Sequence, residues 1–214
     1  MDEKSKAEIN YHYSQILQKH GPTIEVVGDI SHDAGEPLER TASEILSTSE
    51  KRYAGLTGIE PIAHDSSVLD IGCALGFLCD YLREAGWQGK YTGVDMNSDM
   101  IGAAKQRLPA EEFICADILT DGFSQQSDYV FCGATVQCKP KFTDPEVYLR
   151  DMIRKMFSLA KKGLAFDIFS TTVDYRHEDK LYTDPVDLVS FCYSLTRRLT
   201  LRADYRPFEF IVYL

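Results

Sequence analysis

Apolar runs alternate with segments of helical spacing from Ser67 onward, and this alternation limits the possible folds more than any other feature. The runs suit buried strands, and the residues between them suit helices. The expected strands cover residues 68–71, 91–95, 113–117, 129–134 and 164–169, and the expected helices cover 76–85, 98–108 and 145–160. Ser98 and Asp144 are candidate helix caps. Alternating β and α units predict a mainly parallel α/β sheet, covered by helices on both faces and joined by right-handed crossovers.

The end of the chain departs from this alternation. Residues 184–196 predict a helix with Asp184 as its cap and Pro185 at its first position. Two strand-like runs follow, 199–205 and 208–214, with only two residues between them. A link this short cannot form a parallel crossover, so we expect these two runs to pair antiparallel.

The first 60 residues lie outside the repeating pattern. Residues 4–19 and about 38–56 have helical spacing, whereas the Gly, Pro, Asp and Ser signals of 21–37 predict a loop. We therefore expect an N-terminal helical segment, 1–60, packed as a lid or substrate segment on a core of residues 61–214. The two parts should form a single compact domain.

Composition excludes several classes of protein. The 33 acidic and 23 basic residues give a net charge of −10, which disfavours a nucleic-acid substrate. The six cysteines form no C-x-x-C pair, so their spacing does not indicate zinc. No apolar run is long enough to span a membrane, and the charged start MDEKSKAEIN lacks a signal-peptide core. We expect a cytoplasmic protein.

A small-residue bend follows the first expected strand. The strand ends with Asp70 and Ile71, and the bend runs from Gly72 to Gly76. Small residues let a ligand approach the main chain, and the next helix directs its free N–H groups toward the same place. A dinucleotide site would place its third glycine at Phe77, which cannot fill that role. A cofactor that joins a nucleotide to an amino acid fits better; a turn that binds nothing is the alternative.

Acidic residues also end the next two expected strands. Asp95 lies where a carboxylate would hold ribose hydroxyls, although a cap before the next helix is the alternative. Asp117 can accept a hydrogen bond from an adenine amino group, while Met96 and Ile118 can pack on the faces of the ring. Three acids at successive strand ends favour a nucleoside ligand more than any one of them alone.

In the order of its motifs the chain resembles the class I, Rossmann-like S-adenosylmethionine-dependent methyltransferases. The matching pieces are VLDIGCALG, YTGVDMNSDMIGAAKQRL, FICADIL, DYVFCGAT and the closing FEFIVYL. SEKRYAGL and KKGLAFDIFS further resemble a small bacterial subgroup whose substrates are mostly unassigned. The resemblance implies a three-layer αβα fold with a mainly parallel seven-stranded sheet whose last strand is antiparallel. It also implies S-adenosylmethionine as cofactor and S-adenosylhomocysteine as product.

The resemblance assigns roles to residues by position. The methionine part of the cofactor would lie against Gly72, Cys73, Ala74 and Gly76, with Asp70 supporting the bend or contacting the amino group. Asp95 would take the ribose hydroxyls and Asp117 the adenine amino group, beside Met96 and Ile118. Gly133 would approach the sulfonium, and Arg52 would pair with the cofactor carboxylate, unless it is a solvated helix cation. Ala74 replaces the usual glycine, so weakened binding is expected.

The acceptor is less constrained. A base matters only if the acceptor must lose a proton. Asp167 and His177 are the catalytic candidates, and the candidate substrate contacts are Tyr11, Tyr13, Thr135, Gln137 and Tyr175. No NPPY-like stretch follows the fourth strand, which disfavours nucleobase amines, and no acid cluster indicates a metal.

We therefore expect methyl transfer to an oxygen, nitrogen or carboxylate of a small molecule. The subgroup alone suggests natural-product or sugar biosynthesis, by a monomer or homodimer. The alternatives are a non-catalytic protein with the same fold that binds the cofactor or its product or has a regulatory role, and an NAD-dependent oxidoreductase. Phe77 and the reversed last strand disfavour the oxidoreductase.

Overall fold

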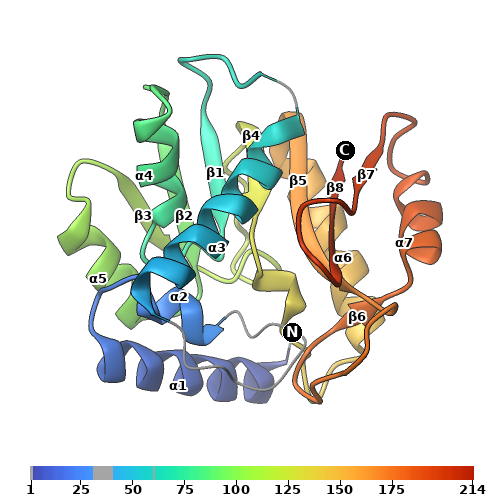
Figure 1. The fold of residues 1–214 in the computed structure, drawn as a ribbon, viewed down its shortest axis with the longest axis horizontal. Helices are drawn as coiled ribbons and strands as arrows, with labels where there is room; N and C mark the ends of the chain where they lie inside the picture. Colours follow the sequence, from blue (N-terminus) through green and yellow to red (C-terminus); the bar gives the residue numbers. More distant parts are fainter. Residues whose placement is uncertain (1, 31–40, 60) are drawn as a thin grey trace.

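A single mixed sheet organises the molecule (Figure 1). The structure is a computed structural model that describes residues 2–30, 41–59 and 61–214. The strands are β1 (Val68–Ile71), β2 (Tyr91–Asp95), β3 (Glu112–Cys115), β4 (Ser127–Cys132), β5 (Ala160–Ser170), β6 (Tyr182–Thr183), β7 (Thr200–Arg202) and β8 (Glu209–Tyr213). Their order is β3-β2-β1-β4-β5-β8-β7, with β6 paired to β5.

Strand directions confirm the expected fold class. The pairs among β1 to β5 are parallel, and β8 runs antiparallel to both β5 and β7. Over the described residues, the sheet has eight strands, one more than the seven expected. The addition, β6, is a two-residue strand that pairs with Phe169 and Ser170. It can pair there because β5 continues beyond Phe166, the last residue of β5 that pairs with β4.

Helices form close to their expected positions. They are α1 (Glu3–His20), α2 (Glu25–Ile30), α3 (Ala42–Leu56), α4 (Phe77–Glu84), α5 (Ser98–Arg107), α6 (Pro145–Leu159) and α7 (Pro185–Cys192), with 3-10 turns η1 (Thr57–Ile59) and η2 (Thr135–Gln137). Asp144 and Asp184 cap α6 and α7 as expected. The cap of α5 is Asn97 instead of Ser98, because the Asn97 side chain accepts from the N–H groups of Asp99 and Met100.

The loop expected over residues 21–37 is partly wrong. A turn at Gly21 ends α1, and α2 then forms over residues 25–30. Val26 on this helix is fully buried beside Ile16 and Leu75, so apolar contacts outweigh the nearby turn signals. Residues 31–40, which include the start of the helix expected from residue 38, lie outside the described residues.

Two apolar cores cover the two faces of the sheet. One packs Leu69, Val130 and Phe166 against α6 and α7, and the other packs Val68, Tyr129 and further residues against α3, α4 and α5. A third cluster joins α1 and α2 to the bend after β1. Figure 1 shows α1 crossing the edge at which the parallel strands end, so the N-terminal helices cover the place where ligands bind in such sheets.

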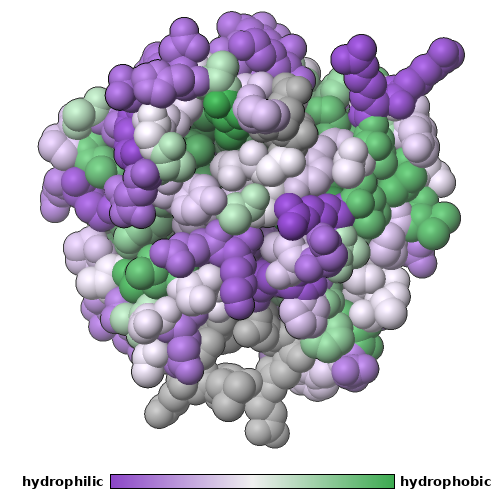
Figure 2. Space-filling view, turned by 45° about the horizontal axis from the view of Figure 1, so that its top comes forward, coloured by the Kyte–Doolittle hydropathy of each residue, from purple (hydrophilic) through white to green (hydrophobic). Residues whose placement is uncertain are grey.

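The surface is mixed in character. Figure 2 shows one face on which hydrophilic residues surround smaller apolar patches. Among the described residues, no helix is both long and apolar enough to cross a bilayer.

Candidate functional site

A cavity lies between the carboxyl ends of the parallel strands and the N-terminal helices. It holds about 1230 Å³ of atom-free space, part of it open to solvent. The N-terminal side contributes Ile9, Tyr13, Val27, Arg52, Tyr53 and Leu56, and the strand ends contribute residues 70–74, 94–96, 116–118 and 133–135. The cavity thus brings together three parts of the expected site: the bend after β1, the end of β2 and the end of β3.

The bend after β1 is held in left-handed backbone conformations. Gly72, Ala74 and Gly76 have φ values of 73°, 45° and 78°. A Cβ on Gly72 would lie 1.8 Å from Thr135 Oγ1, so only glycine fits there. Ala74 tolerates an unfavourable φ because its N–H is bonded to Asp95 Oδ2 at 3.0 Å. Ala74 therefore replaces glycine without changing the left-handed bend.

Asp95 connects this bend to the end of β2. Its Oδ1 accepts from the Asn97 N–H at 2.9 Å, and its Oδ2 accepts from Ala74. Burial raises the pKa of Asp95, and these N–H groups oppose the shift. Each carboxylate oxygen can accept a further bond, which is the geometry that two ribose hydroxyls require. Asp95 can therefore support the start of the next helix and still bind the ribose hydroxyls.

Asp117 already has a cationic partner from α1. Lys6 Nζ lies 2.9 Å from Asp117 Oδ2 and donates to Thr120 Oγ1 at 2.7 Å. The Leu119 N–H donates to Asp117 Oδ1 at 2.9 Å. Burial acts to raise the pKa of Asp117, but the Lys6 and Leu119 contacts outweigh it and lower the pKa. Met96 and Ile118 line the cavity beside this carboxylate.

Asp70 lies buried under the bend and accepts from the Tyr91 hydroxyl at 2.6 Å. Burial raises its pKa to about 7; the Tyr91 bond acts against this shift, and the charge of Asp95 adds to it. Asp70 therefore titrates close to neutral pH. It lines the cavity, so it can support the bend and sense a cation bound there.

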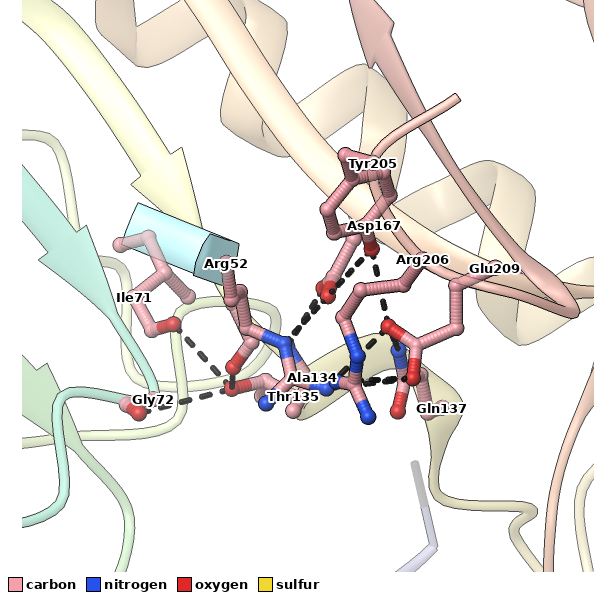
Figure 3. Close-up of polar contacts among 11 residues, drawn as sticks. Arg52, Ile71, Gly72, Ala134, Thr135, Gln137, Asp167, Tyr205, Arg206 and Glu209 are labelled. Carbon is pink, nitrogen blue, oxygen red and sulfur yellow. Dashed lines mark hydrogen bonds and ion pairs between the residues drawn. The ribbon is translucent and has the colours of Figure 1, made fainter. Parts of the chain in front are cut away.

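Arg52 lines the cavity and is bonded to two buried carboxylates. Its Nε donates to Asp167 Oδ2 at 2.6 Å, and its Nη2 donates to Glu209 Oε2 at 3.1 Å (Figure 3). Its Nη1 takes no part in these two bonds. The solvated-cation alternative is wrong, since only 2% of the residue is exposed. Pairing with a cofactor carboxylate stays a prediction.

The two expected catalytic residues do not reach the cavity. Asp167 is completely buried, and Arg52 and the Ala134 N–H occupy its two oxygens. His177 lies in the loop between β5 and β6, where its ring meets the Tyr175 ring at 4.9 Å and its N–H donates to the Tyr182 hydroxyl. Neither residue is among those that line the cavity. The geometry does not support either as a base.

The expected substrate residues separate into two groups. Tyr13 and Thr135 line the cavity. Gln137 is buried and bonded to Glu209, and Tyr11 and Tyr175 are 69% and 55% exposed. Gly76 does not line the cavity but precedes α4, whereas Gly72, Cys73, Ala74 and Gly133 do line it.

Sequence analysis named Tyr13 but missed Lys6 and Ile9, which lie on the same face of α1. Lys6, Ile9 and Tyr13 follow one another at helical spacing and point to the site, so the periodicity of this helix could have identified them. The Tyr13 hydroxyl also lies 2.7 Å from Cys138 Sγ. No sequence signal linked these two residues, which are 125 positions apart.

Comparison with known proteins identifies a domain in this chain. A model described as "Methyltransferase domain" matches residues 68–163, which include the bend, Asp95 and Asp117. This part of the chain is a class I S-adenosylmethionine-dependent methyltransferase domain. Its cofactor is therefore S-adenosylmethionine, and the oxidoreductase alternative is set aside.

Two curated relatives of this methyltransferase match over different lengths. A Mycobacterium tuberculosis protein named as a methyltransferase, Rv1506c, is 27% identical over 154 residues, which are 68% of this chain and 90% of the relative. Trans-aconitate 2-methyltransferase of Rhodopseudomonas palustris is 35% identical over 97 residues, or 45% of this chain. The match spans only 36% of that relative.

A solved structure supports the fold of the methyltransferase. Magnesium protoporphyrin IX methyltransferase from Synechocystis, crystallised with S-adenosylmethionine, superposes with a TM-score of 0.66. The superposition covers 100% of this chain and 96% of that chain at 16% identity. At this identity the likeness shows the fold alone.

The cavity of the methyltransferase fits its cofactor. Asp95 offers acceptors to a ribose, Asp117 offers acceptors beside the apolar Met96 and Ile118, and the bend brings main chain to the cavity wall. Acidic groups also suit a ligand that carries a sulfonium cation. Among residues 2–30, 41–59 and 61–214, no three His, Cys, Asp or Glu side chains group as metal ligands.

Proposed function

We propose that this methyltransferase transfers a methyl group to an oxygen or nitrogen of a small molecule, and that a carboxylate oxygen is the best-supported acceptor. The cofactor supplies an electrophilic methyl group on its sulfonium. The acceptor's lone pair forms the new bond to this carbon as the carbon–sulfur bond breaks. The protein aligns the two groups and excludes water.

The cavity wall carries this proposal. Neither expected base reaches it, and burial raises the pKa values of the cavity-lining Tyr13, Tyr53 and Tyr148 hydroxyls well away from neutrality. Asp70 titrates near neutral pH, but it is buried under the bend and already accepts a hydrogen bond from the Tyr91 hydroxyl. An acceptor that is already ionised at neutral pH needs no such base. A carboxylate meets this condition, whereas an alcohol does not.

The relatives are consistent with this choice. Trans-aconitate 2-methyltransferase, which is 35% identical over 97 residues, is named for an acid substrate. The expected roles in natural-product or sugar biosynthesis, the monomeric or dimeric state and the cytoplasmic location remain predictions. The same holds for the division into an N-terminal lid, 1–60, and a core, 61–214.

A labelled-methyl assay tests the proposed activity. The protein is incubated with S-adenosylmethionine labelled in its methyl group and with matched sets of carboxylic acids, amino sugars and phenols. We expect label to pass to a carboxylic acid at a rate that stays level from about pH 6 to pH 9, because a carboxylate is ionised throughout this range. If label passes only to amines or phenols, at a rate that rises with pH, the result would contradict the carboxylate assignment.

The non-catalytic alternative gives a different result in the same experiment. A regulatory protein would bind S-adenosylmethionine and S-adenosylhomocysteine, and both would raise its melting temperature. It would transfer no label to any class of acceptor. Stabilisation by NAD in place of these ligands would contradict the cofactor assignment itself.

A further inference from the structure

Four charged side chains are buried where α3, β5 and β8 meet (Figure 3). Besides its bond to Asp167, Arg52 contacts Glu209, and Arg206 Nη1 lies 3.0 Å from Glu209 Oε1. The Tyr205 hydroxyl donates to Glu209 Oε2 at 2.8 Å. The two cations balance the two carboxylates, which lets the charges lie in the interior. We name Arg52, Asp167, Arg206 and Glu209 the charge network.

The loop after β4 joins this network to the cofactor cavity. On one side the Ala134 N–H donates to Asp167 Oδ1 at 2.6 Å. On the other side Thr135 Oγ1 donates to the Ile71 carbonyl at 3.2 Å and packs where Gly72 has no side chain. Residues 133–135 all line the cavity. The loop is thus anchored to the charge network at one end and to the bend at the other.

Ala134 needs this support. Its φ of 59° is in the left-handed region that alanine avoids. A residue keeps such a conformation only where the surrounding structure determines it. The short bond from Ala134 to a charged carboxylate is a strong restraint of this kind. Asp167 is in turn oriented by Arg52, so its second oxygen is directed at the Ala134 N–H.

We propose that Asp167 is a positioning residue: it holds Ala134 left-handed and thereby sets residues 133–135 against the reacting end of the cofactor. Glu209 and Arg206 balance the charge of the network and keep Arg52 in place. This inference rests on the proposed function, because it assigns the loop to the methyl-transfer end of the cavity. It gives the buried acid a role that does not require proton transfer.

Four variants test the proposal with S-adenosylhomocysteine as the probe and calorimetry as the readout. Asp167→Asn offers one oxygen, which the Arg52 cation takes, so an amide N–H faces the Ala134 N–H. We expect its dissociation constant to rise about tenfold, as for the loss of one charge-assisted hydrogen bond. Adding Ala134→Gly should restore most of the affinity, because glycine adopts positive φ without strain.

The matched control removes the other carboxylate of the network. Glu209→Gln makes the same charge change but leaves the Ala134 bond in place. Adding Ala134→Gly to this variant should change its dissociation constant by less than about twofold. Wild-type affinity in Asp167→Asn, or no recovery in the double variant, would overturn the proposal. The labelled-methyl assay on the wild type tests the proposed function separately.

Hydrogen exchange on the wild-type protein tests the same idea if Asp167→Asn does not fold. We expect the Ala134 amide to be protected with and without S-adenosylhomocysteine, because Asp167 holds it in both states. If the Ala134 amide exchanges rapidly in the free protein and slowly only with the probe bound, the ligand and not Asp167 fixes the loop conformation. That result would contradict the proposal.

Discussion

Ala74 shows how much one residue of the bend can and cannot reveal. The sequence identifies it as a departure from glycine, and the structure shows that it has the positive φ that glycine would adopt. Its N–H bond to Asp95 makes the departure tolerable. This compensation depends on a contact between residues 21 positions apart, which local sequence does not reveal.

Substitutions at Ala74 should therefore depend on backbone strain. Ala74→Gly removes the strain but adds freedom to the unfolded chain, so we expect the free energy of unfolding to change by less than about 1 kcal/mol. Ala74→Val places a β-branched residue at positive φ and should destabilise the protein by about 2 kcal/mol. Urea denaturation measures both; equal effects of the two variants would contradict the strain argument.

Asp95 should matter most for cofactor affinity. Asp95→Ala removes the expected ribose acceptors and the support of the bend, so we expect the dissociation constant for S-adenosylhomocysteine to rise at least about tenfold. Asp151→Ala, an exposed acid on α6, is the control. Calorimetry measures both variants. An unchanged constant in Asp95→Ala would remove Asp95 from the ribose assignment.

Asp70 should make stability depend on pH. Its pKa of about 7 in the folded protein exceeds the ordinary value of 3.8, so folding favours its protonated form. This contribution is complete below pH 3.8 and is lost as the pH rises through about 7. Asp70→Asn stays neutral and can still accept from Tyr91. The free energy of unfolding of Asp70→Asn, measured relative to that of the wild type, should therefore rise by a few kcal/mol between about pH 4 and pH 8.

Paired denaturation curves at several pH values check this difference. If the gap between Asp70→Asn and the wild type stays constant over this range, Asp70 does not titrate there. A gap that narrows with rising pH would mean that folding favours the ionised carboxylate.

At the scale of elements, α1 is the part that the sequence located but did not explain. Its bounds were expected almost to the residue, yet Tyr13 was the one residue of its cavity-facing side that was named. The helix is bonded across the cavity through Lys6 to Asp117 and through Ser14 to Asp99, and Asn97 donates to the Asn10 carbonyl. These partners come from separate loops, so only the fold brings them to α1.

Loosening α1 should therefore speed the release of bound ligand. Lys6→Ala removes a partly buried ion pair worth about 1 kcal/mol, so the dissociation rate of S-adenosylhomocysteine should rise about fivefold. Lys51→Ala, an exposed lysine of α3, is the control. Surface plasmon resonance measures the rate. Slower release in Lys6→Ala would instead mean that Lys6 competes with adenine for Asp117.

For the whole molecule, the spacing of apolar residues and the length of the links between them were enough to predict most of the fold. Apolar runs located the parallel strands, and the short link before the last run predicted the antiparallel pair that the structure confirms. The two-residue β6 carries too little pattern to be read from sequence. The charge network could not be predicted because Arg52, Asp167 and Glu209 meet only after α3, β5 and β8 assemble.

A crystal structure with S-adenosylhomocysteine tests the central claim, that the cavity under α1 is the cofactor site. The account predicts the ribose hydroxyls on Asp95, the adenine between Met96 and Ile118 near Asp117, and the sulfur facing residues 133–135. An adenosyl group bound elsewhere, or a cavity still filled by α1 at saturating ligand, would contradict it.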